Sequence, residues 1–172
     1  ELPAIGLVVS GGHTDLIYMK NLEDWKWLGG TRDDAAGECF DKVARILGLP
    51  YPGGPAIERL ADEFEEKKRD IKGPRLPRPM LDQDNLEMSF SGIKSALSNL
   101  AGKLMTESKD EFEKKIPYLA YEVSNAVVDV LVEKTLRAVE EFQPKSVLLA
   151  GGVAASKRLR QRLETEVKKR ET

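Results

Sequence analysis

The sequence has very little of what secreted, membrane-bound or metal-binding proteins use. It contains one cysteine, Cys39, and one histidine, His13, among 172 residues. A single cysteine cannot form a disulfide within the chain, which favours a cytoplasmic location. No residue spacing resembles a zinc or iron site, so we expect no metal site formed by this chain alone.

Long apolar runs and a strong net charge are also missing. No run approaches the ~20 apolar residues that span a bilayer, and the first residues lack a signal-peptide pattern, so we expect no membrane association. The formal net charge is −2, so no overall field draws the chain to nucleic acid or anionic lipid. The sequence begins with Glu1 rather than methionine, as in a processed, tagged or excised chain.

What is present suits one α/β domain, since 41 % of residues are hydrophobic and 33 % are charged. Apolar runs bounded by glycine predict strands, and 3.6-residue spacing predicts helices. Thr31 and Ser91 are expected to cap helices, Pro55 to open one, and a break is expected near Pro117. We predict strands at 4–9, 15–19, 25–28 and 146–150, and helices at 33–47, 55–70, 91–104, 110–142 and 154–170.

Three glycine pairs, at positions 11–12, 53–54 and 151–152, fall at the ends of predicted elements. Glycine lets the backbone approach a ligand closely, and N–H groups freed at such turns bind phosphate. Each pair alone is equally consistent with an ordinary tight turn. The first glycine pair lies inside a hairpin, and the last lies between a strand and a helix. Two lobes that clamp a nucleotide need both a hairpin loop and a strand–helix turn.

Side chains near the first glycine pair allow two interpretations. His13 either orients the loop or contacts a ligand. Ser10 and His13 could form a nucleophile and its base, but no third residue that would orient the histidine is evident.

Three acidic residues, Asp34, Glu38 and Asp41, follow at i, i+4 and i+7, which is one face of a helix. That face is either solvated, or Asp41 accepts hydrogen bonds from ligand hydroxyls or holds Mg²⁺ through water.

Two groups of basic residues are candidates for RNA phosphates by counterion release. The first lies on the proline-rich loop 72–83 and contains Lys72, Arg75 and Arg78. The second lies on the last helix, where interleaved acidic residues favour ordinary surface charge instead. Its members are Lys157, Arg158, Arg160, Arg162, Lys168, Lys169 and Arg170.

Six stretches together resemble the tRNA N6-adenosine threonylcarbamoyltransferases, the TsaD family, long known as O-sialoglycoprotein endopeptidases. They occur in the family's order from one end of the chain to the other, and jointly they are far more specific than any glycine pair. The stretches are LVVSGGHT (7–14), DDAAGECFDKVAR (33–45), GLPYPGGP (48–55), PRPM (77–80), SFSGIK (89–94) and AGGVAA (150–155).

The resemblance implies a fold and an activity. The fold is an actin-like ATPase (RNase H-like) lobe, a β-sheet flanked by helices with a helical insertion. Residues 1–172 would be the second lobe of a larger two-lobe protein, incomplete at both ends. Family members transfer the threonylcarbamoyl group of threonylcarbamoyl-adenylate to N6 of adenosine 37 in tRNAs that read codons starting with A.

The resemblance also assigns roles to residues of this chain. The substrate-binding loop corresponds to Val8, Val9, Ser10, Gly11 and Gly12, with His13 shaping the loop. Further substrate-binding positions are Asp41, Gly54, Glu58 and Ser156, with Gly151 and Gly152 as the nucleotide turn. The family usually has asparagine where this chain has Ser156, which has a shorter reach and no amide.

Cofactors and partners follow from the same resemblance. Family members carry iron or zinc, whose ligands fall outside residues 1–172, and bind ATP or threonylcarbamoyl-adenylate, with Mg²⁺ as a further candidate. They act on tRNA with partner proteins, so we expect this fragment to be inactive alone. Ser156 favours an alternative, a non-catalytic paralogue that binds nucleotide or a partner. A metalloendopeptidase is less well supported, because no protease nucleophile or zinc helix is present.

Overall fold

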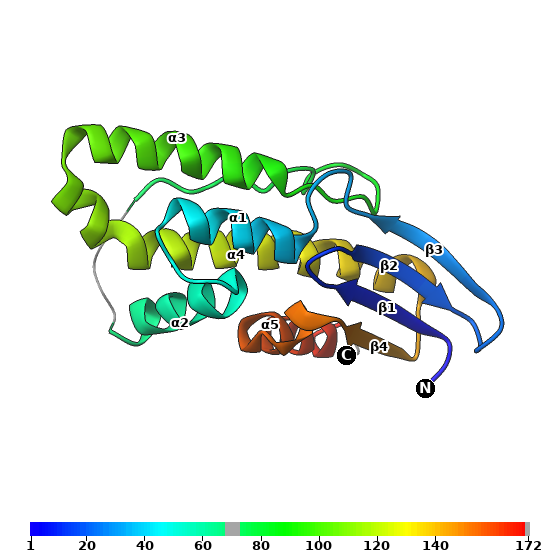
Figure 1. Cartoon of the computed structure of the whole chain (residues 1–172). Helices are drawn as coiled ribbons and strands as arrows, with labels where there is room; N and C mark the ends of the chain where they lie inside the picture. The colour runs from blue at the N-terminus through cyan, green and yellow to red at the C-terminus, as the bar shows by residue number, and fades with distance from the viewer. Residues whose placement is uncertain (68–72, 171–172) are drawn as a thin grey trace.

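The computed structural model describes residues 1–67 and 73–170. Its elements form one sheet and a set of helices, drawn in Figure 1. In chain order they are β1 (Ala4–Val9), β2 (Thr14–Met19), β3 (Trp25–Gly30), α1 (Ala36–Ile46), α2 (Gly53–Glu66), α3 (Ser91–Glu107), α4 (Lys109–Phe142), β4 (Ser146–Ala150), the 3₁₀ helix η1 (Gly152–Ala155) and α5 (Lys157–Lys168).

The sheet has the strand order β3-β2-β1-β4. β1 and β2 form the predicted antiparallel hairpin, β3 extends it antiparallel, and β4 lies parallel to β1. A parallel neighbour requires a long crossover, which the four helices between β3 and β4 provide. This arrangement confirms the expected α/β class, and α1 to α3 form the expected helical insertion ahead of α4.

The two faces of the sheet differ in their covering. Ile5 and Leu7 of β1 are fully buried on the face toward the helices, where Tyr18 of β2 packs on Phe142 of α4 with ring centroids 5.0 Å apart. The opposite face carries Trp27, which is 52 % exposed. Figure 1 shows the long α4 behind the strands and, among the described residues, no helix over the other face.

The expected break near Pro117 was wrong, because α4 is a continuous helix of 34 residues. Proline removes one backbone donor and so bends a helix without necessarily ending it. In Figure 1 the first turns of α4 lie at an angle to the remainder. The helix survives because its apolar side packs into the core, where Val123 and Val127 are fully buried.

The predicted cap of the first helix was also wrong. α1 begins at Ala36 rather than residue 33, and its first N–H donates to Thr14 Oγ1 on β2 at 2.9 Å. Thr31 instead closes the preceding turn, because its hydroxyl donates to the carbonyl of Asp34 at 2.6 Å. Asp33 and Asp34 therefore precede the helix.

The start of α3 required a similar correction. Ser91 is the first helical residue rather than the cap, and the N-cap position is Phe90, whose side chain makes no capping bond. The capping acceptor is Asp33, whose Oδ1 accepts the N–H groups of Phe90 at 2.8 Å and Ser91 at 3.1 Å.

Smaller boundary differences concern the remaining elements. α2 begins at Gly53, so Pro55 is its third residue rather than its first, and residues 68–70 of the predicted helix lie outside the described part. α5 begins at Lys157, three residues later than predicted, because η1 and the N-cap Ser156 come first. β3 extends to Gly30. In the described part of the chain, no helix is long and apolar enough to cross a membrane.

Candidate functional site

The turn between β1 and β2 is closed by its own backbone and by Ser10. The Ser10 N–H donates to the carbonyl of His13 at 2.7 Å, and the Ser10 hydroxyl oxygen accepts the N–H groups of Gly12 at 3.2 Å and His13 at 3.0 Å. The His13 ring points to Asp15, with Nδ1 3.7 Å from Oδ2, and its side chain is 76 % exposed. Ser10 thus organises the loop through the backbone N–H groups that its hydroxyl oxygen accepts.

This turn is fixed against the beginning of α1. The Gly37 N–H donates to the Ser10 carbonyl at 3.1 Å. A Cβ atom added to Gly37 would lie 2.6 Å from that oxygen, so only glycine permits the approach. The contact brings Gly11 to the N-terminal end of α1.

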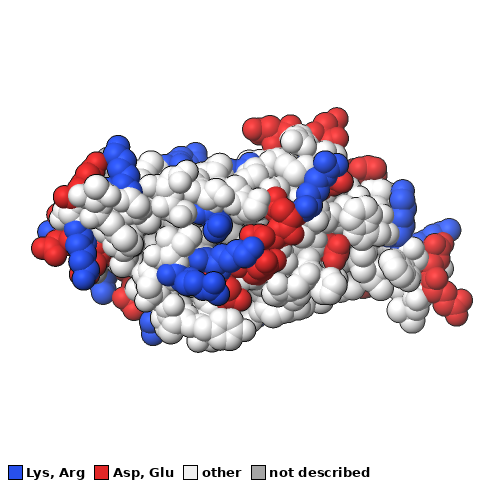
Figure 2. Space-filling model, turned by 45° about the horizontal axis from the view of Figure 1, so that its top comes forward, with Lys and Arg blue, Asp and Glu red and all other residues white. Residues whose placement is uncertain are grey.

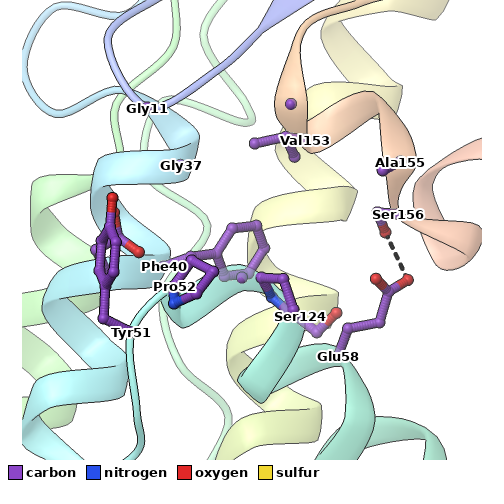
Figure 3. Close-up of a pocket in the computed structure, with 14 residues that line it drawn as sticks. Gly11, Gly37, Phe40, Tyr51, Pro52, Glu58, Ser124, Val153, Ala155 and Ser156 are labelled. Atoms are coloured by element: carbon purple, nitrogen blue, oxygen red, sulfur yellow. Dashed lines mark hydrogen bonds between the residues drawn. The ribbon is translucent and has the colours of Figure 1, made fainter.

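A cavity of about 310 Å³ opens beside this contact. The ends of several elements meet around it, including the N-termini of α1, α2 and η1 (Figure 3). It is lined by Gly11, Gly37, Phe40, Asp41, Tyr51, Pro52, Gly54, Pro55, Glu58, Ser124, Gly152, Val153, Ala155 and Ser156.

Six of the positions expected from the sequence line this cavity, and six do not. Gly11, Asp41, Gly54, Glu58, Gly152 and Ser156 line it. Val8, Val9, Ser10, Gly12, His13 and Gly151 are not among its lining residues. The Val9 side chain is fully buried in the core, so a ligand can meet only its backbone.

The three acidic residues do not lie on one helix face, because Asp34 precedes α1, and Asp41 makes a contact of its own. Its Oδ1 accepts the Gly53 N–H at 2.8 Å, which joins α1 to the start of α2. Asp34 and Glu38 instead share Lys42, whose Nζ lies 2.7 Å and 2.9 Å from their carboxylates. The hydrogen bond with Asp34, followed by that with Glu38, raises the pKa of Lys42 above its ordinary value.

At the other end of the cavity, Glu58 caps α5. Its Oε1 accepts the Ser156 hydroxyl at 3.0 Å and the Lys157 N–H at 2.7 Å. Ser156 accepts the N–H of Leu159 in turn at 3.2 Å. A carboxylate at a helix N-terminus is favoured by the helix dipole. The pair therefore connects α2 to α5 across the cavity wall, as Figure 3 shows.

Glycines around the cavity fall into two classes. Gly151 is required by the protein's own packing, because its φ is +96° and a Cβ atom would collide with the Val9 carbonyl. Gly11, Gly54 and Gly152 differ, because an added Cβ atom would meet nothing within 4 Å and their φ angles are not positive. Neither packing nor backbone conformation accounts for these three.

Several cavity residues were not singled out from the sequence. Gly37 could have been suspected, because glycine early in an amphipathic helix is unfavourable unless something approaches closely. Phe40 and Val153 belong to apolar stretches whose ordinary interpretation is core. Ser124 lies within α4, and its position in the sequence carries no signal of a site.

The basic residues of the proline-rich loop differ in how far they are available at the surface. Arg78 is largely buried, its Nε 2.9 Å from Asp129, and it also pairs with Glu122. Lys72 lies outside the described residues, while Arg75 is exposed.

On α5, two arginines form ion pairs, as ordinary surface charge would: Arg158 lies 2.8 Å from Glu65 and Arg162 2.8 Å from Asp129. Figure 2 shows a different face, turned toward the top of Figure 1, on which Lys and Arg atoms lie beside Asp and Glu atoms.

The described residues offer neither a metal ligand set nor a reactive thiol. Within residues 1–67 and 73–170 no group of three His, Cys, Asp or Glu side chains could hold a metal ion. Burial, with smaller effects from Asp34 and Asp33, raises the pKa of the Cys39 thiol to about 12. The thiol is fully buried, so it is not available as a nucleophile.

Comparison of the sequence with known proteins identifies one family. The profile of the family "TsaD: tRNA N6-adenosine threonylcarbamoyltransferase" matches residues 1–172. Proteins of that name from a strain of Bacillus cereus and from Bacillus anthracis are each 49 % identical over 171 residues, which is 99 % of this chain and 47 % of the relative. The one from Bacillus subtilis (strain 168) is 50 % identical over 164 residues, 95 % of this chain and 45 % of the relative. The chain spans just under half the length of these relatives.

Proposed function

The chain belongs to the tRNA N6-adenosine threonylcarbamoyltransferase (TsaD) family, and from that premise we propose that its cavity binds threonylcarbamoyl-adenylate. In the full-length protein the threonylcarbamoyl group would pass to N6 of adenosine 37 in tRNAs reading codons that start with A. The observation that carries the proposal concerns three glycines, Gly11, Gly54 and Gly152. All three line one cavity, although a Cβ atom added to any of them would meet nothing within 4 Å.

The chemistry of the lining suits an adenylate. The N-terminal ends of α1 and α2 meet at the cavity, and helix N-termini favour a phosphate group. The carboxylates of Asp41 and Glu58 would accept hydrogen bonds from the ribose hydroxyls. In doing so they would exchange the hydrogen bonds that they make with Gly53 and Ser156 in this structure. We propose that these residues bind and orient the donor, and that the turn at residues 10–13 supports its phosphate.

The remaining parts of the activity are proposed for the full-length protein. Residues 1–172 would be the second of two actin-like lobes, and alone they would not carry out the transfer. The family's iron or zinc ion does not fit the described residues, which contain no ligand set. tRNA and the partner proteins of the modification system would be the partners, in the cytoplasm, with ATP as a further ligand.

A non-catalytic paralogue is the second candidate, and Ser156 is the observation that favours it. Its hydroxyl is engaged with Glu58 and the Leu159 N–H, so it caps α5 where the family usually offers an asparagine amide. Adenosine 37 modification by the unsubstituted full-length protein separates the two candidates. A transferase should be active and should retain its activity in Ser156→Asn, whereas a paralogue should be inactive without the substitution.

The main proposal is tested by Gly54→Ala, with Gly102→Ala as the matched control. Both glycines lie in helices with room for a methyl group, but only Gly54 lines the cavity. Both variants should fold, with stability unchanged or raised by about 0.5–1 kcal/mol. In the full-length protein, Gly54→Ala should weaken binding of a stable adenylate analogue about 5- to 150-fold, because the methyl group occupies the ligand's space.

Isothermal titration and adenosine 37 modification in vitro measure the two effects. Gly102→Ala should match the unsubstituted protein in both. Equal analogue affinity in all three proteins would refute the proposed binding mode.

A further inference from the structure

Tyr51 is the feature of the cavity that the protein's own packing does not explain. Its side chain lines the cavity and is nevertheless 84 % exposed. Among the described residues, no hydrogen bond or ring contact involves it. Of the large hydrophobic side chains that are exposed in the described part, Tyr51 is the one that lines this cavity.

The backbone around Tyr51 is held firmly, so the exposed ring is not part of a loose loop. The Leu49 N–H donates to the Ala44 carbonyl at 2.9 Å before it, and the Gly53 N–H donates to Asp41 after it. Pro52, directly after Tyr51, has a restricted φ and is the N-cap residue of α2. The protein thus presents an aromatic ring to solvent on a fixed support, at low cost in conformational entropy.

The Tyr51 ring forms one side of the cavity mouth, and backbone without side chains forms another part of the lining. Figure 3 shows Tyr51 at the end of the cavity away from the Glu58–Ser156 pair. Gly11 and Gly37, which have no side chains, line the same cavity, and Phe40 adds a buried apolar surface. A flat, partly apolar group fits such a place better than a charged or branched one.

We propose that Tyr51 is a stacking platform for a purine ring at the mouth of this cavity. The inference rests on the proposed function and extends it to a residue with no assigned role. Two purines meet in the reaction, the adenine of the adenylate donor and the target adenosine of the tRNA. Aromatic side chains stack on either through the face of the ring.

The test uses Tyr51→Ala, Tyr51→Phe and Tyr51→Trp in the full-length protein. One arm measures the affinity for AMP. The other measures the affinity for an anticodon stem-loop RNA with adenosine 37, against the same RNA with an abasic position 37. Tyr51→Ala should weaken either AMP binding or the adenosine-dependent part of RNA binding about 5- to 150-fold, and the arm that responds identifies the purine.

Controls separate stacking from other roles. Tyr51→Phe and Tyr51→Trp should retain affinity within about threefold, because both keep an aromatic face. Trp25→Ala, which removes an exposed aromatic ring that does not line the cavity, should leave both arms unchanged.

Unchanged affinity of Tyr51→Ala in both arms would overturn the inference, and so would equal losses in Tyr51→Phe and Tyr51→Ala. If the unsubstituted protein bound neither AMP nor the RNA, the proposed function itself would fail.

Discussion

A single carboxylate, Asp33, joins two parts of the chain that lie 56 to 58 residues apart. It accepts the hydroxyls of Ser89 at 2.6 Å and Ser91 at 2.7 Å, together with two backbone N–H groups at the start of α3. Burial opposes its ionisation, but these hydrogen bonds outweigh that effect and lower the pKa of Asp33. The loop before α1 and the helix α3 therefore depend on one ionised group.

Asp33 should make stability depend on pH in acid. A lowered folded-state pKa means that its contribution is complete above the ordinary carboxyl pKa, about 3.9, and is lost as the pH falls below it. Asp33→Asn should cost on the order of 1 kcal/mol at pH 7, because an amide nitrogen cannot accept a hydroxyl. Urea unfolding from pH 7 to pH 3 measures this, and the difference between the two proteins should shrink in acid. A constant difference would contradict the assignment.

At the scale of elements, α4 is the support on which the other segments are fixed. Glu122 accepts the N–H of Leu76 at 2.9 Å and pairs with Arg78, which also reaches Asp129. Lys134, fully buried, donates to the carbonyl groups of residues 83 and 85 at 2.8 Å and 2.7 Å. The proline-rich loop therefore owes its position to charged groups of α4 rather than to elements of its own.

The Arg78–Glu122 pair should show strong coupling. Arg78→Ala should cost about 3–5 kcal/mol, because Glu122 would remain buried without its partner. The double variant Arg78→Met, Glu122→Met should cost less than the sum of its own single variants, Arg78→Met and Glu122→Met, with a coupling of about 1–3 kcal/mol by urea unfolding. Lys109→Ala, which breaks an exposed pair with Glu113 on the same helix, is the control and should cost less than about 1 kcal/mol. Additive effects at Arg78 and Glu122 would contradict the coupling.

Elements were predictable from the sequence where the signal is local. Each predicted strand exists, because apolar runs such as residues 4–9 are bounded by glycine or polar residues. The start of α1 was not predictable, because its capping group comes from elsewhere: α1 uses Thr14, 22 residues away. The start of α4 was predicted to within one residue, and its cap, Ser108, is local. The site was half predictable for the same reason, since glycine turns are visible in a sequence while Ser124 and Phe40 enter it only through packing.

At the scale of the whole molecule, the sheet has one covered and one open face in the described part of the chain. Trp25 and Trp27 lie on the open face and are 61 % and 52 % exposed. Leu148, on the edge strand β4, is 45 % exposed on the same face. The helices all contribute to the opposite side, so the core is built on one side of the sheet.

Tryptophan fluorescence should report this asymmetry, because the chain contains only these two tryptophans. A folded preparation of residues 1–172 should emit at wavelengths close to those of the unfolded protein and be quenched readily by acrylamide. Trp25→Phe isolates Trp27, whose Nε1 donates to Asp15 at 2.9 Å, and should be quenched similarly. A blue-shifted spectrum with weak quenching would show that the open face is covered in solution.

The bond between Glu58 and Ser156 also sets an order of events during synthesis. Its partners are 98 residues apart, so Glu58 leaves the ribosome well before the wall that it supports exists. Until η1 and the first turn of α5 have emerged and docked, a growing chain has the hairpin turn and α2 but no closed cavity. The wall of the cavity is therefore complete only after residues 152–156 have been made and have docked against Glu58.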